Sequence, residues 1–128
     1  MALVDTLTTD HRALEGLAEA LLKLANERSK NFEPAAVVLF RAMYQNMLQE
    51  ERGPFITHRN SAPGLVQELL AEHKRLYHEM GMQLRRAYDS GDWIKTTSVV
   101  RNVLDTLRVH HRREERLFFP YLSKAAVR

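Results

Sequence analysis

The amino-acid sequence predicts an all-α fold, an antiparallel up-down-up-down bundle of four helices. In four stretches of helical length, apolar residues recur at intervals of three and four. Runs of β-branched residues with a period of two, which would indicate strands, are absent. Glycine and proline number only 5 and 4 and gather at the breaks, so the connections are short and favour antiparallel neighbours. We expect a single domain over residues 1–128, because a chain of this length supports one core.

The breaks define each predicted helix in turn. The first helix ends at the polar segment Asn26–Pro34, whose proline suits the first turn of the second helix. The second helix ends at Gly53 and Pro54. The third lies between the breaks Asn60–Gly64 and Asp89–Asp92, and the fourth follows.

Histidine and glutamate interrupt the apolar stripes of these helices at positions where leucine or phenylalanine is expected. An ionised carboxylate inside a bundle is costly unless it is paired or bound to a metal. With a rise of about 1.5 Å per residue, the interrupting residues of all four helices fall in one layer of an antiparallel bundle. They are His11, Glu51, His73, His111 and Glu115.

The two halves of the chain resemble each other weakly. Asp10–Leu14 matches Glu72–Leu76, and Gln49–Phe55 matches Arg113–Phe119. A bundle with pseudo-twofold symmetry would place these segments as equivalents.

Paired ligands at helical spacing follow from this repeat. The i, i+4 spacing of His111 and Glu115 puts both side chains on one helix face, and Met47 and Glu51 hold the equivalent positions. Bundles build di-iron and di-manganese sites from such pairs together with histidines of the other helices. The chain has no cysteine, which excludes zinc–thiolate and iron–sulfur sites, and its His and Glu ligands suit Fe, Mn or Zn.

Asp10-His11, Glu72-His73 and the segment HHRREERLFFPYL (His110–Leu122) carry a family resemblance. Across nearly all of its length, the sequence resembles the hemerythrin-like HHE cation-binding domains. The resemblance implies a carboxylate-bridged di-iron centre. It also implies chemistry with dioxygen, peroxide or nitric oxide, or a role in iron handling. The ligands it implies here are His11, Glu51, His73, His111 and Glu115.

Two positions depart from the family pattern. Met47 stands where the second helix should carry a histidine, and Tyr77 stands where oxygen-carrying members have a second histidine on the third helix. These departures argue against reversible oxygen carriage, and they leave a mononuclear centre or another divalent metal open beside di-iron. Tyr44, one turn from Met47 on the same stripe, is a further candidate ligand.

A second hypothesis is a bundle whose metal site has decayed and which serves as a regulatory or protein-interaction module. Met47 favours it. The five polar residues in one layer argue against it, because buried carboxylates without a metal would be costly.

The composition argues against nucleic-acid and membrane partners. Lys and Arg exceed Asp and Glu by 19 to 16, but they are dispersed among acids, which is more typical of a solvated surface than of a nucleic-acid site. No apolar run approaches the roughly 20 residues that span a bilayer, so we expect no membrane partner. The N-terminal segment lacks the features of a signal peptide, so we expect a cytoplasmic protein with a small ligand such as dioxygen, peroxide or nitric oxide.

Overall fold

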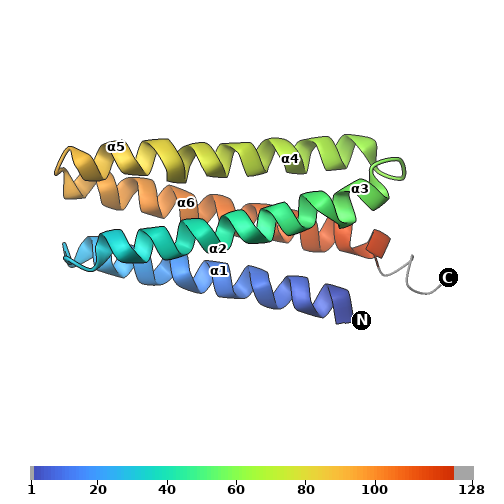
Figure 1. The fold of residues 1–128 in the computed structure, drawn as a ribbon, viewed down its shortest axis with the longest axis horizontal. Coiled ribbons are helices and arrows are strands. Elements are labelled where there is room, and N and C mark those ends of the chain that lie inside the picture. Colours follow the sequence, from blue (N-terminus) through green and yellow to red (C-terminus); the bar gives the residue numbers. More distant parts are fainter. Residues whose placement is uncertain (1, 123–128) are drawn as a thin grey trace.

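Four helical rods lie side by side in the computed structural model, which describes residues 2–122 (Figure 1). The first rod is α1 (Ala2–Asn26), and the second is α2 (Phe32–Arg52) with the short α3 (Pro54–His58) after it. The third comprises α4 (Pro63–His78), the π-helical turn η1 (Glu79–Gln83) and α5 (Leu84–Asp89). The fourth comprises α6 (Trp93–Arg113) and the π-helical turn η2 (Glu114–Phe118). No strand occurs among the described residues, which confirms the predicted all-helical class.

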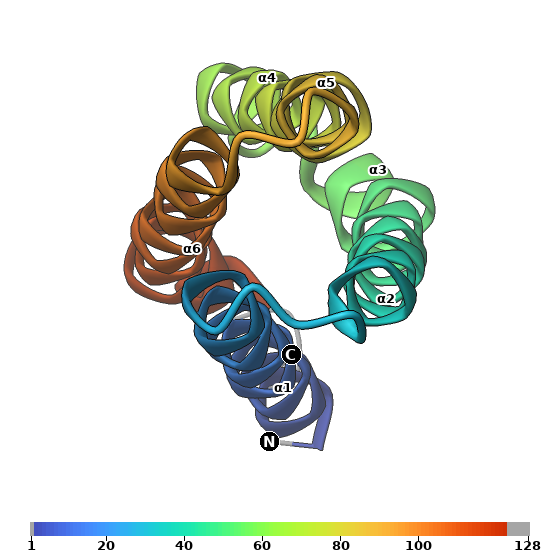
Figure 2. The same cartoon turned by 90° about the vertical axis from the view of Figure 1, so that its left-hand side faces the viewer.

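The rods surround a common centre when viewed end-on (Figure 2). Helix α1 packs against α2 and α6, and α5 packs against α6. The connections after α1 and after α5 lie at one end of the molecule, whereas α3 and the segment before α4 lie at the other (Figure 1). All four rods therefore run past the same middle layer.

Local sequence explains where the rods begin and end. Pro54 opens α3 directly after Gly53, which ends α2. Gly91 adopts a positive φ of 77°, which glycine does without strain, and the side chain of Asp92 then accepts a hydrogen bond from the Lys95 amide at 3.0 Å to begin α6. The predicted breaks between the helices are therefore confirmed.

The buried residues of the rods alternate at spacings of four and three. On α1 they include Leu7, His11, Leu14, Ala18, Leu21 and Ala25. On α2 they include Leu39, Met43, Asn46 and Glu50, and on α6 and η2 Val100, Val103, Leu107, His110 and Glu114. A mean spacing of 3.5 is the repeat of helices that supercoil around each other.

The predicted stripe of the second helix is wrong by one residue. It placed Tyr44 and Glu51 on the buried line, but Met43 and Glu50 occupy that line, and Tyr44 is 46% exposed. At the end of the fourth helix Glu114 is likewise buried in place of Glu115. The pattern allowed both choices because acidic residues occupy both adjacent positions on each helix.

A layer of buried polar side chains separates two apolar clusters. We call it the polar layer, and it consists of His11, Glu50, His73, His110 and Glu114. The larger cluster lies toward the connection between α1 and α2 and is built around residues such as Leu21, Met43 and Leu107. The smaller cluster lies on the other side of the layer and includes Leu7, Phe55, Leu69 and Phe118. The two clusters keep bulk water from both sides of the polar layer.

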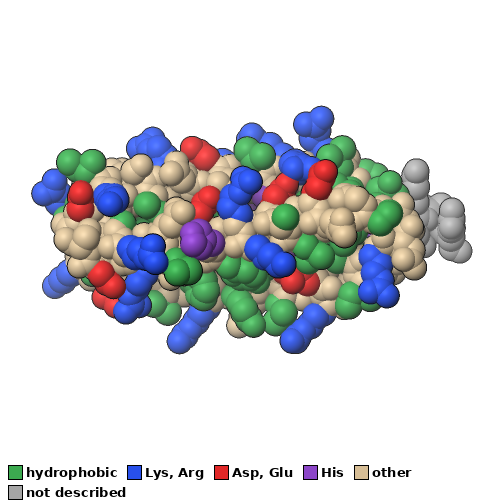
Figure 3. Space-filling view, turned by 90° about the horizontal axis from the view of Figure 1, so that it is seen from above, with side chains coloured by type: hydrophobic (Ala, Val, Ile, Leu, Met, Phe, Trp, Pro, Cys, Tyr) green, Lys and Arg blue, Asp and Glu red, His purple; other side chains and the backbone are tan. Residues whose placement is uncertain are grey.

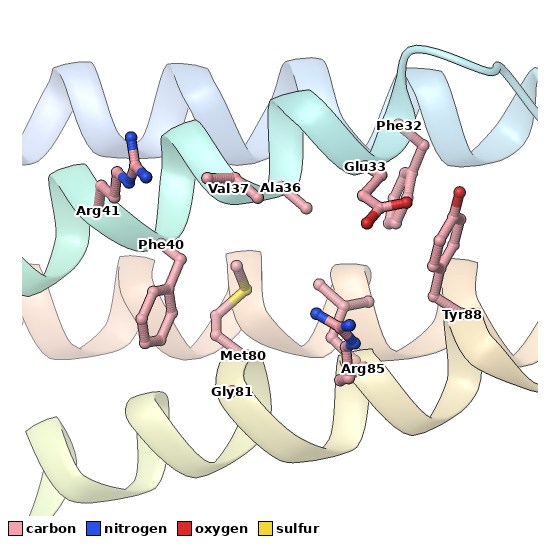
Figure 4. A pocket seen from close by; sticks show the side chains of 11 residues that line it. Phe32, Glu33, Ala36, Val37, Phe40, Arg41, Met80, Gly81, Arg85 and Tyr88 are labelled. Atoms are coloured by element: carbon pink, nitrogen blue, oxygen red, sulfur yellow. The ribbon is translucent and has the colours of Figure 1, made fainter.

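A groove of about 390 Å³ lies between α2 and the third rod (Figure 4). Phe40 and Met80 line it, and Arg41 and Arg85 lie at its edges. None of the residues of the polar layer lines this groove. The groove is thus a feature of the apolar part of the bundle.

Charged side chains are scattered over the surface. On the face seen in Figure 3, Lys and Arg side chains alternate with Asp and Glu and form no continuous basic stripe. Within residues 2–122, no helix has the length and apolar character needed to cross a membrane.

Candidate metal centre

The five side chains of the polar layer come from all four rods. His11 lies on α1, Glu50 on α2, His73 on α4, His110 on α6, and Glu114 begins η2. Each of these residues is at most 2% exposed. Ligand atoms of Glu50, His73, His110 and Glu114 all lie within 4.8 Å of one another, so the four can contact a single metal ion.

Each histidine of the polar layer has its Nδ1 atom engaged by an outer carboxylate. His11 Nδ1–H donates to Glu115 at 2.9 Å, and His73 Nδ1–H donates to Glu51 at 2.8 Å. His110 Nδ1–H donates to Glu72 at 2.6 Å. In the neutral ring such a bond sets the tautomer and leaves the Nε2 lone pair for a metal.

The two inner carboxylates divide their oxygens between two sides. Glu50 Oε1 lies 3.3 Å from His73 Nε2, while Glu50 Oε2 lies 3.2 Å from His11 Nε2. Glu114 Oε1 lies 3.7 Å from His73 Nε2 and contacts His110 Nε2, while its Oε2 lies 3.7 Å from His11 Nε2. The Oε1 atoms thus face His73 and His110, and the Oε2 atoms face His11.

Most inner atoms of the layer lack hydrogen-bond partners, although His11 Nε2 and Glu50 Oε2 bond to each other at 3.2 Å, and this tests whether the residues suit a metal. Among the described side chains, the buried N and O atoms without a hydrogen bond include Glu50 Oε1, His73 Nε2, His110 Nε2 and both carboxylate oxygens of Glu114. Native proteins rarely leave such atoms unsatisfied without a water, an ion or a functional reason. Imidazole nitrogens and carboxylate oxygens are good ligands for Fe, Mn and Zn, so the residues fit a divalent cation.

Burial and mutual contact perturb the protonation of the inner carboxylates. Burial, with the adjacent Glu50 carboxylate, raises the pKa of Glu114 well above its usual range. Burial also raises the pKa of Glu50, but interactions with the adjacent Glu114, His11 and His73 side chains outweigh it and hold that pKa below its usual range. Burial and the mutual repulsion of the two carboxylates therefore oppose a second negative charge on the pair.

The histidines divide between charged and neutral forms. Burial lowers the pKa of His73, but the adjacent carboxylates of Glu114 and Glu50 outweigh burial and raise the pKa to about 9. The pKa of His11 is also raised, because its bond to Glu50 outweighs burial. Binding of a cation must therefore displace protons from the layer.

Aromatic rings and arginines enclose the layer. Phe119 stacks on His11 with ring centroids 5.4 Å apart, and Phe55 stacks on His73 at 5.3 Å. Further out, Arg12 bonds to Glu115, and Arg113 bonds to Glu72. Two of the outer carboxylates, Glu115 and Glu72, are therefore themselves held in place by cations.

The structure brings only part of the predicted site together. His11 and His73 lie in the polar layer as expected. Glu51 and Glu115 do not lie inside it. Their side chains are 30% and 22% exposed, and they accept hydrogen bonds from His73 and His11. The predicted inward position of these two carboxylates is therefore wrong, and Glu50 and Glu114 occupy it.

The predicted His111 lies beside the layer. It is 1% exposed, its ring stacks on His11 with centroids 3.9 Å apart, and its Nδ1 bonds to Glu15 at 2.7 Å. Burial, with repulsion from His11 and His110, lowers the pKa of His111 to about 2, so this ring is neutral. His110, which is not among the predicted ligands, is one of the four residues within reach of a single metal ion.

The remaining predicted residues lie outside the polar layer. Tyr44 is 46% exposed, and its ring centroid lies 5.8 Å from that of Tyr77. Met47 is buried in the larger apolar cluster. The residue one helical turn before Glu50 is Asn46, so the departure from the expected His-x-x-x-Glu pair falls at Asn46.

The family model of the hemerythrin HHE cation binding domain matches residues 64–128. No curated protein and no solved structure gives a significant match. The matched part of the chain contains His73, His110 and Glu114, three of the five residues of the polar layer.

Proposed function

Because the chain belongs to the hemerythrin HHE cation-binding domain family, we propose that it is a non-haem iron protein with a dinuclear centre in its polar layer. The observation that carries the proposal is the inward set of unpartnered ligand atoms, with each Nδ1 atom held by an outer carboxylate. A core built for packing alone would place apolar side chains at these positions.

The proposed ligands follow from the two sides of the carboxylate pair. His73 and His110, with the Oε1 atoms of Glu50 and Glu114, would hold one iron. His11 and the Oε2 atoms would hold the second, so that both carboxylates bridge. Iron bound here would supply redox chemistry and open coordination positions for dioxygen, peroxide or nitric oxide.

The chain's own residues have separate tasks in this proposal. Glu51, Glu72 and Glu115 orient the three imidazoles and raise their basicity. Phe55 and Phe119 cover His73 and His11 and limit access of water. We further propose that the scaffold is one antiparallel up-down-up-down domain, since the connections between rods alternate between its two ends.

Metal analysis tests the proposal. We expect protein produced with iron to contain about two irons per chain, with absorption in the near-ultraviolet and visible. Glu114→Gln should lose most of the metal. Glu33→Gln, a matched change at an exposed position of α2, should retain it. Wild-type protein that takes up no iron, manganese or zinc would contradict the proposal.

The alternative is a bundle whose metal site has decayed and which acts as a regulatory or interaction module. Asn46 favours it, because an amide stands one turn before Glu50 where a histidine would complete the ligand pair. On this alternative, protein exposed to iron would remain metal-free, and chelator would not change its thermal stability.

A further inference from the structure

The two halves of the chain contribute to the polar layer by the same rule. His11 is bonded by Glu115 of the other half, and His73 is bonded by Glu51 of the other half. Glu50 and Glu114 face each other from α2 and η2, one carboxylate from each half. The internal repeat seen in the sequence is therefore also a repeat of hydrogen bonds.

Among the five residues of the polar layer, the repeat fails at one position. In the second half, His110 lies one turn before Glu114, and its ring centroid is 4.7 Å from that of His73. In the first half, the equivalent residue one turn before Glu50 is Asn46. The Oε1 side of the carboxylate pair thus has the imidazoles of His73 and His110, whereas within the polar layer the Oε2 side has only that of His11. The ring of His111 stacks on His11 from outside the layer, with its Nδ1 bonded to Glu15.

Asn46 is not a surface residue that happens to fall on this line. It is 8% exposed, and its Nδ2 atom has no hydrogen-bond partner among the described residues. A buried amide without a partner has lost its hydrogen bonds to water without replacement, so packing alone does not explain it. In the internal repeat, Asn46 corresponds to His110 and His11 corresponds to His73. Asn46 therefore holds the position next to His11 that His110 holds next to His73.

We propose that Asn46 makes the two metal positions unequal. The first cation binds tightly between His73, His110 and the Oε1 atoms. The second binds weakly and exchangeably beside His11, because Asn46 supplies no imidazole there. This inference rests on the proposed metal function and concerns how the two positions differ within it.

Stepwise titration of metal-free protein with Co²⁺ tests the inequality. Co²⁺ reports its ligands through its visible spectrum, and calorimetry gives the affinity of each step. We expect the first equivalent to bind more tightly than the second by on the order of tenfold or more, the scale on which one supporting group changes metal affinity. Two steps of equal affinity would overturn the inference.

Substitutions at Asn46 assign the inequality to that residue. Asn46→His should tighten the second step by on the order of tenfold and leave the first unchanged. Asp10 is the counterpart of Glu72, so the new imidazole has a carboxylate in the equivalent place. Asn46→Leu, similar in size but without ligand atoms, should titrate like wild type. Loss of the second step in Asn46→Leu would make Asn46 itself a ligand and overturn the inference.

A reciprocal variant keeps the test decisive if Asn46→His does not fold. His110→Asn gives both halves the same residue, so it should weaken the first step until the two affinities agree. Retention of a tenfold difference in His110→Asn would contradict the inference. Failure of every folded variant and of wild type to bind Co²⁺ would instead reject the metal centre itself.

Discussion

The polar layer and the larger apolar cluster are built on the same helices and follow the same spacing of buried positions. Along α6 that spacing passes from Val100, Val103 and Leu107 to His110, and then to Glu114 in η2. Burial of the apolar side chains stabilises the folded state. Burial of the polar side chains opposes it, because desolvation disfavours the charged forms of His73 and Glu50. Stability of the fold therefore does not explain the polar layer, and function explains it better.

Replacing the inner carboxylates Glu50 and Glu114 should have the largest effect, because it makes the polar layer resemble the apolar cluster. We expect Glu50→Leu with Glu114→Leu to abolish metal binding completely. The metal-free protein should become more stable by about 1–4 kcal/mol, as buried ion clusters often do when replaced by apolar residues. Chemical denaturation and metal analysis measure the two effects. A double variant that still binds metal, or that unfolds more readily than metal-free wild type, would contradict this reasoning.

A substitution in the larger apolar cluster should have the opposite effect, lowering stability without changing metal binding. Leu107 is fully buried one turn before His110 and His111. Leu107→Ala should destabilise the protein by about 2–5 kcal/mol through the lost contacts and the cavity left behind. Its metal content per folded chain should stay at the wild-type value. A proportional loss of metal would show that the layer and the cluster are not separate.

The outer carboxylates should give an intermediate effect. Glu51→Ala removes the acceptor of His73 Nδ1–H but no proposed ligand atom. We expect metal affinity at the position of His73 to fall by about 10–100-fold while the stoichiometry is unchanged. Arg85→Ala, at an exposed position outside the polar layer, is the control and should not alter either quantity. If the metal affinity of Glu51→Ala equals that of wild type, Glu51 does not orient His73 for metal binding.

The smallest expected effect is a pH dependence that differs with and without metal. The pKa of His73 is raised from 6.5 to about 9, so its protonated form stabilises the metal-free fold below pH 6.5, and this stability is lost as pH rises through about 9. Metal binding requires neutral His73, so metal affinity should rise over the same interval. Thermal unfolding and metal titration between pH 6.5 and 9 should thus show opposite trends. Parallel trends would contradict the assignment.

Most of the fold could be predicted from the sequence. The spacing of apolar residues and the glycine and proline breaks predicted the four helices. The positions of His11 and His73 along their helices predicted the height of the polar layer in the bundle. Counting residues along a helix suffices for this, because the rise per residue is constant.

The choice between adjacent residues could not be predicted in the same way. Glu50 and Glu51 are both acidic, as are Glu114 and Glu115, and neighbours on a helix differ by about 100° in direction. The mean spacing of 3.5 in the bundle and the π-helical turn that starts at Glu114 decide which of them faces inward.

The sequence by itself determined that histidines and carboxylates of four helices meet in one layer. Only the tertiary structure decided that Glu50 and Glu114 form its inside while Glu51 and Glu115 support the imidazoles from outside. It also decided that Asn46, not Met47, stands in the polar layer where the second half of the chain has His110. The reason is physical: helix rotation is set by how neighbouring rods pack, and a local sequence pattern with polar residues at adjacent positions does not contain that information.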